Sequence, residues 1–240
     1  MDYNNFKFDG LADDRNLSVS SAFPVLMRKV YVWMTLALVI TGITAFGVAS
    51  SPVIQMFLFS SKAVFWGLFI AELVLVMAVS AAINRLSLTT ATLLFVLYSV
   101  INGTTLSVIF MVYTMNSIAN VFFITAGTFG AMAFIGYTTK KDLSTMGRIL
   151  MMALIGLIIA SIVNIFWGNG MLDLIISYVG VAIFVGLTAY DSQKIKEMLQ
   201  QAEDTDESMQ KLALLGSLTL YLDFINLFLY LLRIFGNRRD

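Results

Sequence analysis

Seven long, predominantly apolar runs divide the chain, and each is close to the length of a helix that spans a membrane. A spanning helix needs about 20 apolar residues, because each residue adds about 1.5 Å against a hydrocarbon core of about 30 Å. The runs cover residues 30–50, 63–83, 89–113, 118–137, 149–167, 172–190 and 212–236. They are too long and too continuous for the alternating strands of an outer-membrane barrel. The pattern therefore predicts an all-α integral membrane fold with seven transmembrane helices.

Composition narrows the chemistry that such a bundle can carry. Hydrophobic residues make up 59% of the chain and charged residues 12%, which agrees with a protein surrounded by lipid. The 15 basic and 15 acidic residues cancel, so nucleic acid is not an expected partner. Without Cys or His, the chain has no thiolate or imidazole ligand, and we expect no cofactor. A bound or transported metal would be a hard cation held by oxygens, for which calcium is the natural candidate.

The distribution of Lys and Arg predicts the orientation. Residues 1–27 are polar and form an expected cytoplasmic tail, and residues 28–240 form the transmembrane domain. With the N-terminus inside and the C-terminus outside, 11 of the 15 basic residues are cytoplasmic. The four outside are Lys62, Arg233, Arg238 and Arg239. A last segment that dipped in and returned would bring the final three inside as well, but 25 residues suit a full span better.

Three carboxylates fall where lipid makes a charge costly. Glu72 lies ten residues after Lys62, about 15 Å deep, and Asp223 lies twelve residues after Lys211, about 18 Å deep. Asp191 closes the sixth run at its cytoplasmic end, where an ordinary solvated carboxylate is an equal alternative. An acid inside a membrane indicates a functional site until a partner accounts for it.

The last run carries a polar stripe. Asp223, Asn226, Tyr230 and Arg233 recur at helical spacing and lie on one face. The stripe predicts a protein or water interior with Glu72 as a buried partner, so that Glu72, Asn226 and Tyr230 continue a polar pathway. An internal hydrogen-bond ladder that only holds the bundle together is the alternative.

Small residues mark a second face, on the fourth run. They are Ala126, Gly127, Gly130 and Ala131, and Ala182 with Gly186 repeats the spacing on the sixth run. Such faces are typical of close helix packing, which is the interpretation we adopt for both.

Two acidic motifs resemble those of the Bax-inhibitor family of seven-helix membrane proteins, in its bacterial branch. They are LTAYDSQKIK at 187–196 and SLTLYLDFINLF at 217–228, with KKDL at 140–143 as further support. The resemblance extends over nearly the whole chain from about Arg28. It implies six helices packed around a central seventh and a pH-sensitive calcium leak. It also makes Asp191 and Asp223 the paired pH sensor and gate, with a tentative calcium site there, and makes Arg85 the expected latch, although the sequence around Arg85 matches only loosely.

The physics of a carboxyl pair agrees with this resemblance. Two carboxylates close together in a low dielectric cannot both be charged cheaply, so the pair is expected to share a proton and to sense pH. An ion pair between Arg85 and Asp191 would close the inner mouth, and protonation of Asp191 would release it. The expected function is a calcium-permeable leak channel in the cell inner membrane.

Three other classes of membrane protein are alternatives to a channel. A non-conducting regulator that binds a membrane protease or another membrane partner remains open, because nothing in the bundle distinguishes it. An intramembrane aspartyl protease would need Gly-x-Gly-Asp, whereas Asp223 follows Leu220, Tyr221 and Leu222, so no enzyme is expected. A retinal protein would need a lysine within 212–236, which holds none.

Overall fold

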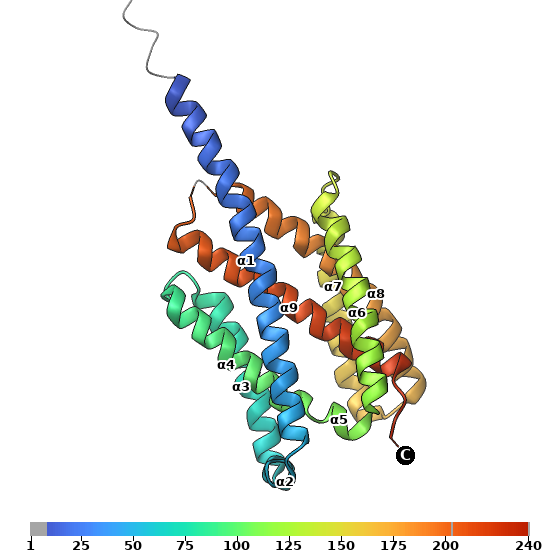
Figure 1. Cartoon of the computed structure of the whole chain (residues 1–240). Coiled ribbons are helices and arrows are strands. Elements are labelled where there is room, and N and C mark those ends of the chain that lie inside the picture. Colours follow the sequence, from blue (N-terminus) through green and yellow to red (C-terminus); the bar gives the residue numbers. More distant parts are fainter. Residues whose placement is uncertain (1–8, 203, 240) are drawn as a thin grey trace, which may run out of the picture.

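The computed structural model describes residues 9–202 and 204–239, and over these residues it contains helices and no strand. The helices are α1 (Asp9–Ala49), α2 (Pro52–Ser60), α3 (Lys62–Ala82), α4 (Leu88–Leu106), α5 (Ile109–Val112), α6 (Met115–Thr138), α7 (Ser144–Trp167), α8 (Gly170–Gln200) and α9 (Glu207–Phe235). The prediction of an all-helical protein is confirmed (Figure 1).

Six helices are long and apolar enough to cross a membrane, counted over the described residues. They correspond to the predicted runs except for 63–83, which forms α3. The run 89–113 is divided at Ser107 into α4 and the single turn α5. The short helix α2 was not predicted, because its nine residues continue the apolar pattern without a charge to mark them.

Two helices extend well beyond their predicted runs. α1 begins at Asp9, so the polar stretch 9–27 continues the first helix instead of forming a separate segment, and Leu26 and Met27 at its end are buried in the bundle. Residues 1–8 of the predicted tail lie outside the described residues. α8 continues ten residues past Tyr190 to Gln200, because Ile195 and Leu199 keep an apolar face packed on the protein.

Local capping explains where several helices begin and end. The side chains of Ser87, Thr114, Asn169 and Asp206 each accept a hydrogen bond from a backbone N–H of the helix that follows. Such caps satisfy amides that have no partner inside the helix. α7 ends at Gly168, whose φ of +61° is the left-handed conformation that glycine adopts without strain.

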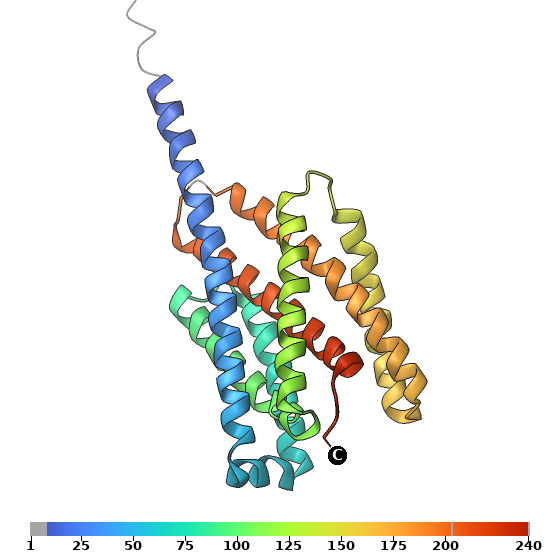
Figure 2. The same cartoon turned by 45° about the vertical axis from the view of Figure 1, so that its right-hand side comes forward.

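Helix α9 forms the centre of the bundle. In its most apolar stretch 67% of the residues are buried, against 6% in α7, whose outer face exposes Ile155, Ile162 and Phe166. α9 packs on α1, α4, α6 and α8 and crosses behind α1 and α6 in Figure 2. An apolar face that no helix covers is the surface expected to meet lipid.

The connections between helices define two ends of the bundle. At one end the backbone N–H of Leu88 donates to Glu207, so the starts of α4 and α9 meet there. At the other end Asn237, just after α9, donates to Ser117 at the start of α6. We call these the Arg85 end and the Asn169 end, after residues in the α3–α4 and α7–α8 turns (Figure 1). α9 therefore crosses the whole bundle and does not turn back.

Candidate functional site

Asp191 and Asp223 lie on neighbouring helices that run antiparallel. α8 and α9 approach closely at Gly180, where a Cβ atom would lie 2.8 Å from the ring of Tyr230, and Gly216 similarly faces Ile195. Gly136 of α6 lies against the backbone of Ala189. These close contacts fix the segment of α8 that carries Asp191 against α6 and α9.

The two carboxyl groups lie close enough to act on one another inside the protein, and both line one cavity. Asp223 is 5% exposed, and its Oδ2 atom is buried without a hydrogen-bond partner, while Asp191 is partly buried. A proton held between the two groups would provide the missing donor and avoid two adjacent negative charges in a low dielectric. The depth estimate from the sequence had placed them more than 10 Å apart. The tilt of α9 and the extension of α8 beyond Tyr190 bring them together.

A cavity of about 470 Å³ surrounds the pair between α7, α8 and α9. Its polar lining comes from α8 and α9, and α7 contributes apolar side chains. The lining residues are Met151, Leu154, Ile158, Phe184, Leu187, Tyr190, Asp191, Lys194, Thr219, Leu222, Asp223, Asn226 and Tyr230. The predicted stripe thus faces one space, with Asp223, Asn226 and Tyr230 in order from the pair toward the Asn169 end.

An ion pair lies beyond the cavity at its Asn169 end. Arg233 Nη1 is 3.3 Å from Asp173 Oδ1, and its guanidinium lies 5.8 Å from the ring centroid of Tyr230. Tyr230 in turn stacks on Phe184 at 5.9 Å. The sequence analysis did not single out Asp173. The sequence feature that could have identified this ion pair is an acid, Asp173, in the first turn of α8 and a base, Arg233, in the last turn of α9. These two turns meet when the helices are antiparallel.

Lys194 marks the Arg85 end of the cavity. Its charge acts on Asp191, three residues earlier, and its ammonium group lies 5.8 Å from the ring centroid of Tyr190. Lys194 is exposed, so this mouth is in contact with water or lipid headgroups.

Arg85 does not form the expected ion pair with Asp191. It is exposed in the turn after α3, and the ion pairs formed by described residues are Lys211 with Glu207 and Arg233 with Asp173. The reason is lateral position: α3 packs on α4 and α2, whereas Asp191 faces α7 and α9. The family resemblance had suggested the pairing, but a position at the end of a helix does not fix which side of the bundle a residue occupies.

Glu72 is buried as predicted, at 9% exposed, but it does not join the stripe. It lies beside Asn102 and Thr105 of α4, and its Oε1 atom has no partner in bonding geometry. Asn102 accepts a hydrogen bond of 2.9 Å from Tyr221, whose hydroxyl also lies 2.8 Å from that of Thr41. Glu72 therefore belongs to a second polar cluster, on another side of α9.

The cavity offers few ligands for a tightly bound metal. Ca²⁺ takes six to eight oxygens, whereas the site combines two carboxyl groups with the hydroxyl of Thr219 and the amide of Asn226. Among the described residues no three acidic side chains are grouped as metal ligands. The arrangement suits an ion that passes with part of its water shell more than one that stays.

Comparison with known proteins finds matches over most of the chain. The family model described as inhibitor of apoptosis-promoting Bax1 matches residues 24–240. Inner membrane protein YbhL of Escherichia coli K12 is 53% identical over 89% of this chain and 92% of its own length. An uncharacterized protein of Borreliella burgdorferi is 47% identical over the same shares, and an uncharacterized membrane protein of Streptococcus pyogenes serotype M1 is 41% identical over 72% of this chain and 74% of its own.

Proposed function

The chain belongs to the Bax-inhibitor family, and from that premise we propose that it is a pH-sensitive calcium-permeable leak channel of the inner membrane whose gate is the Asp191–Asp223 pair. The observation that carries the proposal is the meeting of two carboxyl groups from α8 and α9 within one cavity of a membrane bundle. Intramembrane acids of this kind mark ion or proton pathways.

The proposed pathway follows the cavity from one end of the bundle toward the other. A cation would enter near Lys194, pass the carboxyl pair and meet the amide of Asn226 and the hydroxyl of Tyr230. Beyond Tyr230, the ion pair of Arg233 with Asp173 occupies the exit. The described conformation has barriers at the pair and at this exit, so it corresponds to a closed state.

The gate would respond to protonation of the pair. In the closed state one proton is shared, and the remaining negative charge is stabilised by Lys194. Mild acidification adds a second proton, which removes both the shared bond and the attraction to Lys194. α8 and α9 can then separate at this level, and calcium flux rises.

The fold fits a seven-span arrangement with the Arg85 end in the cytoplasm. α3 would be the seventh span, since its 21 residues exceed the length that about 30 Å of hydrocarbon requires. The Arg85 end carries most of the Lys and Arg residues, as expected of a cytoplasmic face.

Calcium uptake into liposomes that contain only the purified protein tests the proposal. The parent should show little uptake at neutral pH and several-fold more under mild acid. Asp191→Asn mimics the protonated acid, so it should leak at neutral pH, and Asp223→Asn should flatten the pH response. Glu197→Gln, an exposed carboxyl-to-amide change on the same helix, is the matched control and should keep the parent profile.

Asp142, at the Arg85 end, is not a competing sensor. The hydroxyl and the backbone N–H of Ser144 lower the pKa of Asp142 below its ordinary value of about 3.9, so it stays ionised throughout mild acidification. Parent-like pH profiles in both Asn variants would mean that the pair has only a structural role.

A second candidate is a non-conducting regulator. α1 extends past the rest of the bundle at the Arg85 end, where a helix can meet another protein (Figure 1). Pure protein that transports no calcium at any pH would favour this function over the channel.

A further inference from the structure

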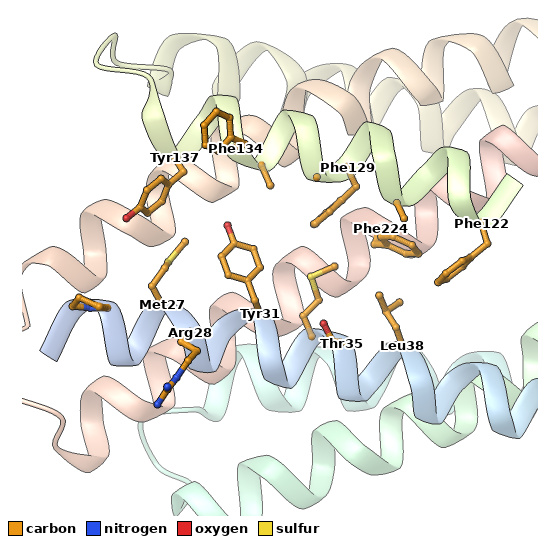
Figure 3. Close-up of a pocket in the computed structure, with 15 residues that line it drawn as sticks. Met27, Arg28, Tyr31, Thr35, Leu38, Phe122, Phe129, Phe134, Tyr137 and Phe224 are labelled. Carbon is orange, nitrogen blue, oxygen red and sulfur yellow. The ribbon is translucent and has the colours of Figure 1, made fainter. Parts of the chain in front are cut away.

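A groove between α1 and α6 forms a hollow with a volume of about 700 Å³. Phe224 of α9 forms part of its floor, and Met34, Leu38 and Phe129 continue the apolar lining. Its volume falls within the range of about 300–1,000 Å³ that is typical of ligand sites. Figure 3 shows the side chains of α1 and α6 facing one another across this space, with Phe224 between them.

The small residues of α6 line this groove and do not pack against a helix. Ala126, Gly130 and Ala133 belong to its wall, and a Cβ atom at Gly127 or Gly130 would meet no other atom within 4 Å. The interpretation of this face as a helix contact was therefore wrong. No described helix fills the space between this face of α6 and α1.

The groove extends through about one leaflet of a membrane. It follows α1 from Pro24 to Leu38, fourteen residues and about 21 Å, and the ten residues past Arg28, about 15 Å, equal half of a hydrocarbon core of about 30 Å. Past Leu38 and Phe122 it narrows to a hollow of about 90 Å³. An apolar chain that entered at the Arg85 end would therefore stop near the middle of the bilayer.

Cations lie at the outer end of the groove. Arg28 is exposed, and among the described residues no acidic side chain pairs with it. Figure 3 shows its guanidinium directed away from the apolar floor, as expected of a side chain that reaches for a headgroup. Behind Tyr137 of the opposite wall, Lys196 of α8 donates to the carbonyl of Tyr137 and lies 5.3 Å from the centroid of its ring.

A second hollow shares the residues at this end. It has a volume of about 360 Å³ on the outer surface of α1 and is also lined by Arg28, Tyr31 and Thr35. Two apolar spaces thus meet beneath one cation. A ligand with two acyl chains and one negatively charged headgroup matches this arrangement.

We propose that the α1–α6 groove binds an anionic phospholipid from the leaflet at the Arg85 end, with one acyl chain beside Gly130 and the phosphate at Arg28. The phosphate receives charge-assisted hydrogen bonds from the guanidinium. Tyr31 and Tyr137, which lie close to one another at this end, flank the glycerol region. The site is separate from the carboxyl cavity, because α8 and α9 lie between them.

Native mass spectrometry with defined lipids tests the proposal. The parent is titrated with phosphatidylglycerol or phosphatidylcholine of identical chains, and phosphatidylglycerol should occupy one site about fivefold more strongly, the ratio for about 1 kcal/mol per basic residue at a membrane surface. Arg28→Gln should abolish this preference. Arg148→Gln removes an exposed arginine at the same end but outside the groove and should preserve it.

A second variant tests the acyl site. Gly130→Leu should fill the groove and reduce occupancy by both lipids several-fold, whereas Gly156→Leu, on the lipid-facing side of α7 and equally uncrowded, should not. Equal affinity of the parent for the two lipids, or an Arg28→Gln variant that behaves like Arg148→Gln, would overturn the proposal. So would a dimer that excludes lipid and is lost in Gly130→Leu, because a second copy would then be the occupant.

Discussion

Lys194, and not Arg85, is the cation beside Asp191, so under the proposed gating Lys194 is the residue expected to set the pH of opening. A positive neighbour favours the ionised carboxylate, so Lys194→Gln should move the onset of calcium flux to higher pH. The expected shift is a few tenths of a pH unit, since exposed ion pairs contribute about 0.2–1 kcal/mol and one unit corresponds to about 1.4 kcal/mol.

Arg85→Gln is the matched control in the same flux assay. It removes an exposed cation from the same end of the bundle, in a turn on the side of α3 and α4, and should leave the pH profile unchanged. A larger displacement in Arg85→Gln than in Lys194→Gln would show that Arg85 reaches Asp191 in another state and acts as the latch after all.

Tyr221 is the residue on which the second polar cluster depends. Its hydroxyl is shared by Thr41 and Asn102, so Tyr221→Phe removes two hydrogen bonds inside the bundle and leaves Thr41 with the carbonyl of Ser99. Interhelical hydrogen bonds in membranes contribute about 0.6–1.7 kcal/mol each, so the loss should be about 1–3 kcal/mol and lower the thermal midpoint by several degrees.

Tyr178→Phe supplies the control for this change, because Tyr178 is 56% exposed on α8 and packs at the lipid surface. Equal midpoints for the two variants would mean that the cluster does not stabilise the fold. Calcium flux in Tyr221→Phe should keep its pH dependence, since Tyr221 lies outside the carboxyl cavity.

Among the helices, α8 depends most on glycines in its neighbours. Gly136→Ala places a methyl group against the backbone of Ala189, two residues from Asp191, and nothing flexible can give way there. Overpacking of this kind costs about 1–3 kcal/mol. Thermal unfolding should show a lower midpoint, and flux at neutral pH should change because α6 displaces α8.

Gly127→Ala makes the same substitution on the same helix where the added methyl group meets no atom within 4 Å. It should be neutral or slightly stabilising, because alanine favours a helix by about 1 kcal/mol over glycine. A Gly136→Ala variant as stable as Gly127→Ala would contradict the packing of α6 on α8.

Helical periodicity predicted which site residues share a face of one helix, but it did not predict which helices lie side by side. Spacing along α9 placed Asp223, Asn226 and Tyr230 on a common face, because rotation per residue is fixed within a helix. Glu72 was assigned by its depth and Arg85 by the family resemblance, and depth carries no information on the side of the bundle that a helix occupies. Sequence spacing gives relations within an element, while packing alone gives relations between elements.

Element ends were less predictable than element cores for a related reason. Apolar runs end where charged residues begin, but α8 continues into polar sequence because one face still packs on the protein. α1 also continues into polar sequence, where it extends past the rest of the bundle. The open face of α6 shows the reverse case. Small residues there suggested a helix partner, whereas the folded chain leaves α1 and α6 separated by a groove.

At the scale of the whole molecule, the start of α1 and the chain after α9 lie at opposite ends of the bundle, which has a direct consequence for topology. The described chain after α9 contacts the start of α6, whereas α1 begins at the Arg85 end. If α3 completes seven spans, the two termini must face different compartments. Since 10 of the 14 described basic residues fall on the side where α1 begins, that side should be the cytoplasm.

Reporter fusions at three positions measure this prediction. Alkaline phosphatase, active only outside the cytoplasm, should be active when fused after Asp240 and inactive when fused before Met1 or inserted in the α8–α9 connection near Asp204. A fluorescent protein that folds in the cytoplasm should give the opposite pattern at the same three positions, which controls for expression. An inactive phosphatase after Asp240, with fluorescence there instead, would place both termini inside. That result would require either that α3 does not cross or that the last helix is displaced from the centre, and with α9 displaced the cavity that joins Asp191 to Asp223 would not form.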